Sequence, residues 1–221
     1  MKKYPLLIFD WDGTLVDSKG LAVFAVQKIA EDLNYPMPSL ESINYWFGLE
    51  LMEMLQKLFP DGDLPQLVER FYYYFSEERA GNGFFEGAVE MLAYLKDSNF
   101  LLAVATNRIK VKLERALELA GIKDLFVATY TSDEYAAKPD PMMLFALLKE
   151  LNMSPEDALM IGDTIFDMQF ARNAGVDGLA ACYGHHTQEQ LAAYNPVGFI
   201  RSLGELKKLL GDSDTLEYGD N

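Results

Sequence analysis

The chain has 221 residues, of which half are hydrophobic and 24% are charged, a composition typical of a globular protein rather than a disordered one. Its net charge of −15 disfavours non-specific binding to nucleic acid or to an anionic membrane surface, so we expect neither as a partner. The single cysteine excludes an internal disulfide and no apolar stretch reaches the length of a membrane span, so we expect a cytoplasmic protein.

The first predicted element is a buried strand, because Leu6–Phe9 is a short apolar run that leads into a glycine-containing turn. The segment that follows has no convincing strand pattern but offers three helical stretches separated by turn residues. These stretches are 21–33, 39–59 and 64–79.

This segment predicts a small all-helical domain, 19–83, inserted into a core domain formed by 1–18 and 84–211. We expect hinges near 16–19 and 81–87. Within the insertion, the aromatic run 71–75 is expected to pack in the interior rather than to serve as a substrate platform.

After the insertion, apolar runs and helical patterns alternate. Further strands are predicted at 101–105, 127–130, 158–161 and 178–182, and helices at 88–96, 111–120, 142–151 and 166–174. This alternation predicts an α/β fold with a doubly wound, Rossmann-like parallel sheet, which binds its ligands at the carboxyl ends of the strands. The last residues, 212–221, are acidic and polar and are expected to form a flexible tail.

Two carboxylates follow the first strand in the sequence Asp-Trp-Asp-Gly-Thr. Asp10 and Asp12 are one residue apart, a spacing that places both side chains on one face of an extended chain. The two groups of such a pair can take different roles: one is ionised and acts as a nucleophile, and the other can hold a proton. Thr14 completes the motif.

Polar residues also follow the second strand. Thr106 and Asn107 could hold a phosphate at the start of a helix or cap that helix, and both roles are compatible. Arg108 could reach a phosphate, although a solvated helix face is favoured for it. Lys138, before Pro139, looks like the start of another helix and could neutralise a transferring phosphoryl group.

The last motif, Gly-Asp-Thr-Ile-Phe-Asp, closes the strand at 158–161. Asp163 stands at the strand end, and Asp167 follows within the first turn of the next helix. Oxygen ligands of this kind suit Mg²⁺. A helix cap at Asp163 or Thr164 is the alternative. His185 and His186 lack the spacing typical of zinc pairs, so a polar loop is favoured.

Together, these four motifs resemble those of the haloacid dehalogenase superfamily, in particular its phosphoglycolate-phosphatase-like branch. The resemblance covers nearly the whole chain and implies a Rossmann-like core with a C1-type helical cap. It implies that Asp10 is the nucleophile and that Asp12 is the general acid and base. Asp12 also argues for phosphate chemistry over halide displacement, because dehalogenases of this superfamily lack the second aspartate.

The resemblance also implies the remaining site. Mg²⁺ would be held by Asp10, Asp163 and the backbone of Asp12, with Asp167 and Thr14 in supporting positions. Thr106, Asn107 and Lys138 would bind the phosphate. The cap loop residues Gly48, Leu49 and Glu50 are candidates for contact with the leaving group.

The predicted function is therefore that of a magnesium-dependent phosphomonoester hydrolase acting on a small phosphorylated metabolite, with phosphoglycolate as the first candidate. A pyrophosphatase or nucleotidase of the same family, a phosphomutase of the β-phosphoglucomutase kind, and a non-catalytic protein that retains the fold are the alternatives. We expect a monomer or a homodimer.

Overall fold

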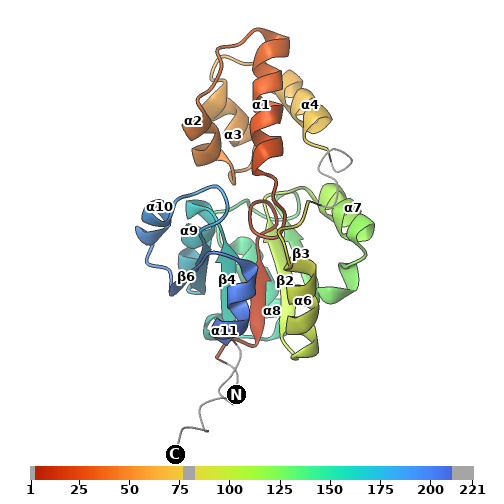
Figure 1. Cartoon of the computed structure of the whole chain (residues 1–221), viewed down its shortest axis with the longest axis vertical. Coiled ribbons are helices and arrows are strands. Elements are labelled where there is room, and N and C mark those ends of the chain that lie inside the picture. Colours follow the sequence, from red (N-terminus) through yellow and green to blue (C-terminus); the bar gives the residue numbers. More distant parts are fainter. Residues whose placement is uncertain (1–2, 77–82, 211–221) are drawn as a thin grey trace, which may run out of the picture.

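The computed structural model describes residues 3–76 and 83–210, and its centre is a parallel sheet of six strands (Figure 1). The strands are β1 (Leu6–Phe9), β2 (Leu101–Thr106), β3 (Ala128–Thr131), β4 (Ala158–Gly162), β5 (Asp177–Ala181) and β6 (Gly198–Ile200). Their order across the sheet is β3-β2-β1-β4-β5-β6. The predicted doubly wound α/β fold is confirmed, and β6 is a strand that the sequence did not predict.

Helices cover both faces of the sheet because the central strands β1, β2 and β4 are apolar on both sides. Leu7 and Phe9 pack with α6 (Ala88–Asp97), α7 (Lys110–Ala120) and α11 (Leu206–Leu210). Leu6 and Ile8 point the other way and pack with α8 (Met142–Leu151) and α9 (Ile165–Ala174). The remaining core elements are α10 (Gln188–Ala192) and the short 3₁₀ helices η1 (Lys123–Leu125), η2 (Pro155–Asp157) and η3 (Leu203–Glu205).

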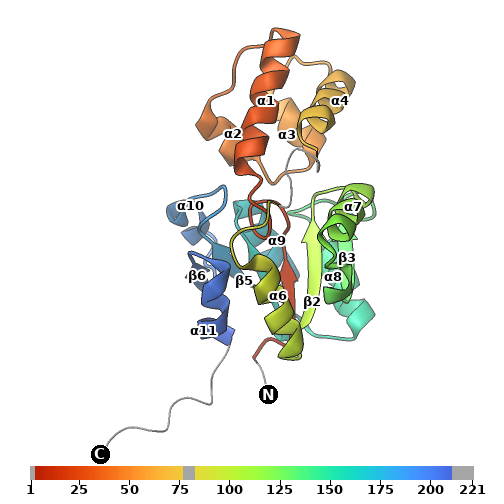
Figure 2. The same cartoon turned by 45° about the vertical axis from the view of Figure 1, so that its right-hand side comes forward.

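Four helices lie beyond the carboxyl ends of the strands, as both views show (Figures 1 and 2). They are α1 (Lys19–Leu33), α2 (Leu40–Trp46), α3 (Leu51–Leu58) and α4 (Leu64–Tyr74). Fully buried side chains such as Ile29, Ile43, Leu55 and Leu67 pack them together. This helical layer, which we call the cap, covers the edge of the sheet at which a parallel fold binds ligands.

The single helix predicted over 39–59 is wrong, because the structure contains two helices, α2 and α3, at that place. Gly48 lies between them at φ +102°, a conformation that a side chain would strain. Glu50 then caps α3 by accepting hydrogen bonds from the backbone N–H groups of Met52 and Glu53. The apolar pattern runs on through this break, so the pattern alone does not indicate it.

The chain passes between core and cap at 16–18 and again at 83–84. Val16 forms an antiparallel bridge with Phe84, and the N–H of Asp17 donates to the carbonyl oxygen of Gly83 at 2.7 Å. The two crossings therefore lie side by side. Part of the second predicted hinge (81–82), the end of the predicted helix 64–79, and the tail 212–221 lie outside the described residues.

Within residues 3–76 and 83–210, none of the helices combines the length and the apolar character that a membrane span requires.

Candidate active site

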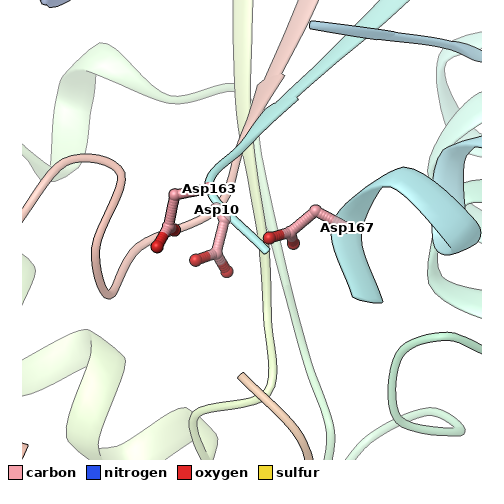
Figure 3. Close-up of side chains that lie close together, drawn as sticks. All are labelled: Asp10, Asp163 and Asp167. Atoms are coloured by element: carbon pink, nitrogen blue, oxygen red, sulfur yellow. The ribbon is translucent and has the colours of Figure 1, made fainter. Parts of the chain in front are cut away.

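Three buried carboxylates meet where β1 and β4 end (Figure 3). Asp10 follows β1, Asp163 follows β4, and Asp167 lies in the first turn of α9. One oxygen from each lies within 4.8 Å of the others. Because β1 and β4 are neighbours, the order of the strands brings together motifs that are 153 positions apart in the sequence. The prediction placed all three side chains near this edge.

Lys138 lies between two of these carboxylates, with its side chain 1% exposed. Its Nζ is 2.7 Å from Asp10 Oδ1 and 2.7 Å from Asp167 Oδ1. Burial alone would lower the pKa of Lys138, but the charges of Asp10 and Asp167 raise it above its usual value. Lys138 therefore stays protonated beside the predicted nucleophile. The helix predicted to start here begins later, at Met142.

The surroundings of Asp10 are short of positive charge. Burial raises the pKa of its carboxyl group well above the ordinary value; Lys138 counteracts this effect, while Asp167 and Asp163 add to it. A cation bound between these oxygens would favour the ionised form. The buried, oxygen-only donor set is also the kind that divalent cations such as Mg²⁺ prefer. The residues present thus fit a divalent metal.

Asp163 is held in place by three hydrogen bonds. Thr14 Oγ1 donates to its Oδ1 at 2.9 Å, and the backbone N–H of His185 donates to its Oδ2 at 2.8 Å, with His185 Nδ1 at 2.9 Å from the same oxygen. Burial opposes ionisation, but His185 and Thr14 hold the pKa of Asp163 below its usual value. A carboxylate that is ionised and fixed in orientation suits a metal ligand.

Asp167 takes part in the cap of α9 and also binds Lys138. Its Oδ2 accepts hydrogen bonds from the backbone N–H and the hydroxyl group of Thr164, at 3.0 and 2.6 Å, and Thr164 caps α9. Its Oδ1 is the atom that binds Lys138. The helix cap therefore orients Asp167 so that it can hold Lys138 against Asp10.

Asp12 is bound by Arg108 rather than by solvent. Arg108 Nε and Nη2 donate to the two carboxylate oxygens of Asp12 at 2.6 and 2.9 Å, and the arginine side chain is only 10% exposed. The expectation of a solvated Arg108 is therefore wrong. The pair lines the cavity in front of Asp10, where a leaving group would lie.

Thr106 is the last residue of β2 and Asn107 follows it, on the opposite side of Asp10 from β4. Both line the cavity. Asn107 Oδ1 accepts from the N–H of Lys138 at 2.8 Å, and its Nδ2 donates to the carbonyl oxygen of Gly48 in the cap at 2.9 Å. Neither residue caps α7, whose N-cap is Ile109, so that alternative is wrong.

The cap loop residues predicted to meet the leaving group all line the same cavity. Gly48 faces Thr164: a Cβ atom at position 48 would lie 2.7 Å from Thr164 Cγ2. Leu49 presents an apolar side chain. The Glu50 carboxylate lines the cavity as well but is engaged in capping α3.

His185 and His186 were expected in a polar loop, but both are buried, at 4% and 2% exposure. His185 contacts Asp163 and stacks on Phe47 of the cap, with ring centroids 4.3 Å apart. His186 Nδ1 accepts from the N–H of Ile165, and its Nε2 lies 3.0 Å from the carbonyl oxygen of Tyr45. Their position just after β5, at the carboxyl edge of the sheet, was the signal available in the sequence.

Comparison with known proteins agrees with this geometry. A family model described as "Haloacid dehalogenase-like hydrolase" matches residues 7–181. The chain belongs to this family. The matched region contains every motif residue described above, so the predicted family and the prediction of an enzyme of the phosphatase type are confirmed.

Individual relatives span nearly all of this haloacid dehalogenase-like hydrolase. A Dickeya dadantii protein named "Probable phosphatase IndB" is 31% identical, over 91% of each chain. A phosphoglycolate phosphatase of Nitrosococcus oceani is 28% identical over 96% of this chain and 99% of its own. The crystal structure of a predicted phosphoglycolate phosphatase from Haemophilus somnus superposes with a TM-score of 0.85, over 95% of this chain and 99% of that one. At 23% identity, this last likeness bears on the fold alone.

Proposed function

We propose that the protein hydrolyses a phosphomonoester of a small metabolite, with Asp10 as the nucleophile. The observation that carries the proposal is the contact between Lys138 and Asp10 on the floor of a cavity also lined by Asp12 and Thr106. An ammonium group beside a carboxylate at such a point can neutralise the charge of an approaching phosphoryl group.

The reaction would proceed in two steps. Asp10 attacks phosphorus and forms an aspartyl-phosphate while the bond to the leaving oxygen breaks, and Asp12 donates a proton to that oxygen. Asp12 then takes a proton from a water molecule, which attacks the same phosphorus and releases inorganic phosphate and free Asp10. Arg108 donates one hydrogen bond to each oxygen of Asp12, so the second lone pair of either oxygen can take the proton.

We propose Mg²⁺ as the metal, held by the side chains of Asp10 and Asp163 and by the backbone carbonyl group of Asp12. When bound, it would supply positive charge to the phosphate oxygens and to Asp10. Asp167 and Thr14 would act indirectly, by holding Lys138 and Asp163. Thr106 and Asn107 would contact the phosphate oxygens.

We further propose that residues 19–83 act as a cap that opens to admit substrate and closes to exclude bulk water. The two adjacent crossings at Val16 and Phe84 support such a hinge. The names of several relatives support phosphoglycolate as a substrate.

Release of inorganic phosphate from a panel of phosphoglycolate, nucleotides, sugar phosphates and pyrophosphate tests the proposal. We expect turnover that depends on Mg²⁺ and is lost on chelation with EDTA and in the Asp10→Asn variant. Phosphate transfer to a sugar phosphate in place of release would instead favour the mutase. Activity retained by Asp10→Asn would contradict the nucleophile assignment.

A further inference from the structure

Apart from Gly48 and Glu50, the cap side of the active-site cavity is aromatic and apolar. The cap residues that line it and carry apolar or aromatic side chains are Phe47, Leu49, Leu51, Met54, Phe71, Tyr72 and Phe75. The floor, formed by Asp10, Asp12 and Thr106, is polar. The cavity therefore has a polar end that suits a phosphate and an apolar end that suits a different part of the substrate.

The aromatic side chains form a connected wall. Phe71 and Phe75 stack with centroids 5.0 Å apart, and Phe47 meets Phe75 at 5.9 Å. Phe47 also stacks on His185, which is hydrogen-bonded to Asp163 in the core. The wall is thereby fixed relative to the place where the phosphate would be held. Interior packing was favoured for the aromatic run 71–75, and three of its residues also face the cavity.

The cations that line the cavity are directed at rings and at Asp12. Arg108 holds Asp12, and its Cζ lies 5.5 Å from the centroid of Phe75. Lys112 Nζ lies 5.4 Å from the centroid of the Tyr72 ring. A short acid such as glycolate would bring a carboxylate against the apolar wall, where pairing it would require Lys112 to leave the ring of Tyr72. A flat ring would instead meet the aromatic side chains of this wall.

The extent of the apolar wall points the same way. A two-carbon leaving group would leave most of the apolar wall in contact with water.

We infer that the leaving alcohol of the substrate carries a flat, unsaturated ring, which binds against Tyr72 and Phe75. The inference rests on the proposed phosphatase function and refines it. It makes these two residues determinants of specificity, while Asp10, Asp12 and Lys138 act on the phosphoryl group of any substrate.

Three phosphomonoesters and one acyl phosphate test the inference. Benzyl phosphate and cyclohexylmethyl phosphate both release a primary alcohol bearing a six-membered ring, but only the benzyl ring is flat. Phosphoglycolate tests the short acid, and acetyl phosphate reports hydrolysis with almost no leaving group to bind. We expect kcat/KM for benzyl phosphate to exceed that for cyclohexylmethyl phosphate by roughly three- to tenfold, the order of an aromatic contact, and to exceed that for phosphoglycolate.

Variants of the cap helix α4 and of the residue that follows it test which side chains produce the preference for the flat ring. Tyr72→Leu should lower the ratio of kcat/KM for benzyl phosphate to that for acetyl phosphate by roughly three- to tenfold. Tyr72 is half-buried, so the variant should fold, and thermal unfolding checks this. Phe75→Leu is the second variant. The matched control is Tyr73→Leu, on the same helix but 59% exposed and not part of the cavity wall, which should keep the wild-type ratio.

The outcomes separate the two proposals. If the wild-type protein hydrolyses none of the four compounds, the phosphatase proposal fails, and this inference fails with it. Hydrolysis of acetyl phosphate without a preference for the flat ring overturns the inference alone, as does a preference for phosphoglycolate. An equal fall in the ratio for Tyr72→Leu and Tyr73→Leu would also overturn it.

Discussion

Lys138 Nζ and Asp10 Oδ1 are 2.7 Å apart in an ion pair whose side chains are 1% and 11% exposed. Asp167 holds the same ammonium group from the other side, also at 2.7 Å. One lysine therefore serves two carboxylates in a site nearly closed to water, where an unpaired charge is costly. The proposed chemistry depends on this arrangement.

Replacement of this lysine should damage both stability and activity. Lys138→Met leaves Asp10 and Asp167 buried without their cation, which should lower the free energy of unfolding by about 3 kcal/mol. Loss of the positive charge at the phosphoryl group should lower kcat by about 10²–10³. Urea unfolding and phosphate-release kinetics measure the two effects.

The control for this prediction is Lys110→Met. Lys110 also forms an ion pair, with Glu134, but its side chain is 46% exposed. Its removal should leave both the free energy of unfolding and kcat close to their wild-type values. Equal losses of stability in the two variants would contradict the claim that the ion pairs of Lys138 contribute more because they are buried.

Asp12→Asn should separate the two steps of the reaction. A p-nitrophenolate leaving group needs no proton, so Asp10 can still be phosphorylated, whereas the water of the second step loses its base. We expect a rapid burst of p-nitrophenolate, close to one per enzyme, followed by slow turnover. Stopped-flow absorbance measures the burst, and steady turnover at the wild-type rate would exclude Asp12 as the base.

Gly48→Ala should disturb the junction of cap and core. The new Cβ would lie 2.7 Å from Thr164 Cγ2, at a backbone φ of +102° that alanine rarely adopts. A strained position of this kind costs about 1–3 kcal/mol, and the displaced loop should lower kcat/KM. Gly20→Ala is the control, because its Cβ would meet nothing within 4 Å and helix α1 favours alanine. The prediction fails if Gly48→Ala and Gly20→Ala have the same thermal midpoint.

Asp133 should make a pH-dependent contribution to stability. Its Oδ1 accepts a hydrogen bond from the backbone N–H of Lys110 at the start of α7, at 2.9 Å. Slight burial acts to raise the pKa of Asp133, but this hydrogen bond and that of Thr131 lower it below the usual value. A lowered folded-state pKa means that the ionised form stabilises the protein. The contribution is complete above the unfolded-state pKa and is lost as the pH falls through the folded-state pKa.

The variant Asp133→Ala tests this contribution. It should lower the free energy of unfolding by about 0.5–1 kcal/mol at pH 7, a small value because the group is exposed. Urea titrations at pH 7 and pH 3 should show that the gap between wild type and variant narrows in acid. A gap of the same size at both pH values would exclude an electrostatic origin.

The sequence predicted the core sheet well because its strands are buried on both faces. Leu6–Phe9 and the run that became β4 are continuous apolar stretches that end at glycine-containing turns, a pattern typical of strands buried in a parallel sheet. The strand β6, Gly198–Ile200, has only three residues at the edge of the sheet, too few to form a pattern. The break at Gly48 depends on a close approach to Thr164 that only the folded chain reveals.

The difference between local sequence patterns and contacts formed only on folding also explains which residues of the site could be predicted. Asp10 and Asp163 stand in recognisable motifs at strand ends and Lys138 stands in a recognisable Lys-Pro motif, so their convergence followed from the fold. The roles of Arg108 and His185 did not follow from a motif, because each role depends on a contact with a residue that is remote in the sequence. Arg108 lies 96 positions from Asp12, and His185 lies 22 positions from Asp163. Local patterns describe a helix face or a loop, not the carboxylate that a long or buried side chain meets.

The central claim is that Asp10 carries the phosphoryl group between the two steps. The most direct test is acid quenching of the enzyme during turnover, followed by peptide mass analysis, with Asp12→Asn used to accumulate the intermediate. The account predicts one added phosphoryl group on the peptide that contains Asp10, and none in the Asp10→Asn variant. A phosphoryl group found on another residue would contradict this claim. Full hydrolytic activity in the Asp10→Asn variant would contradict it as well.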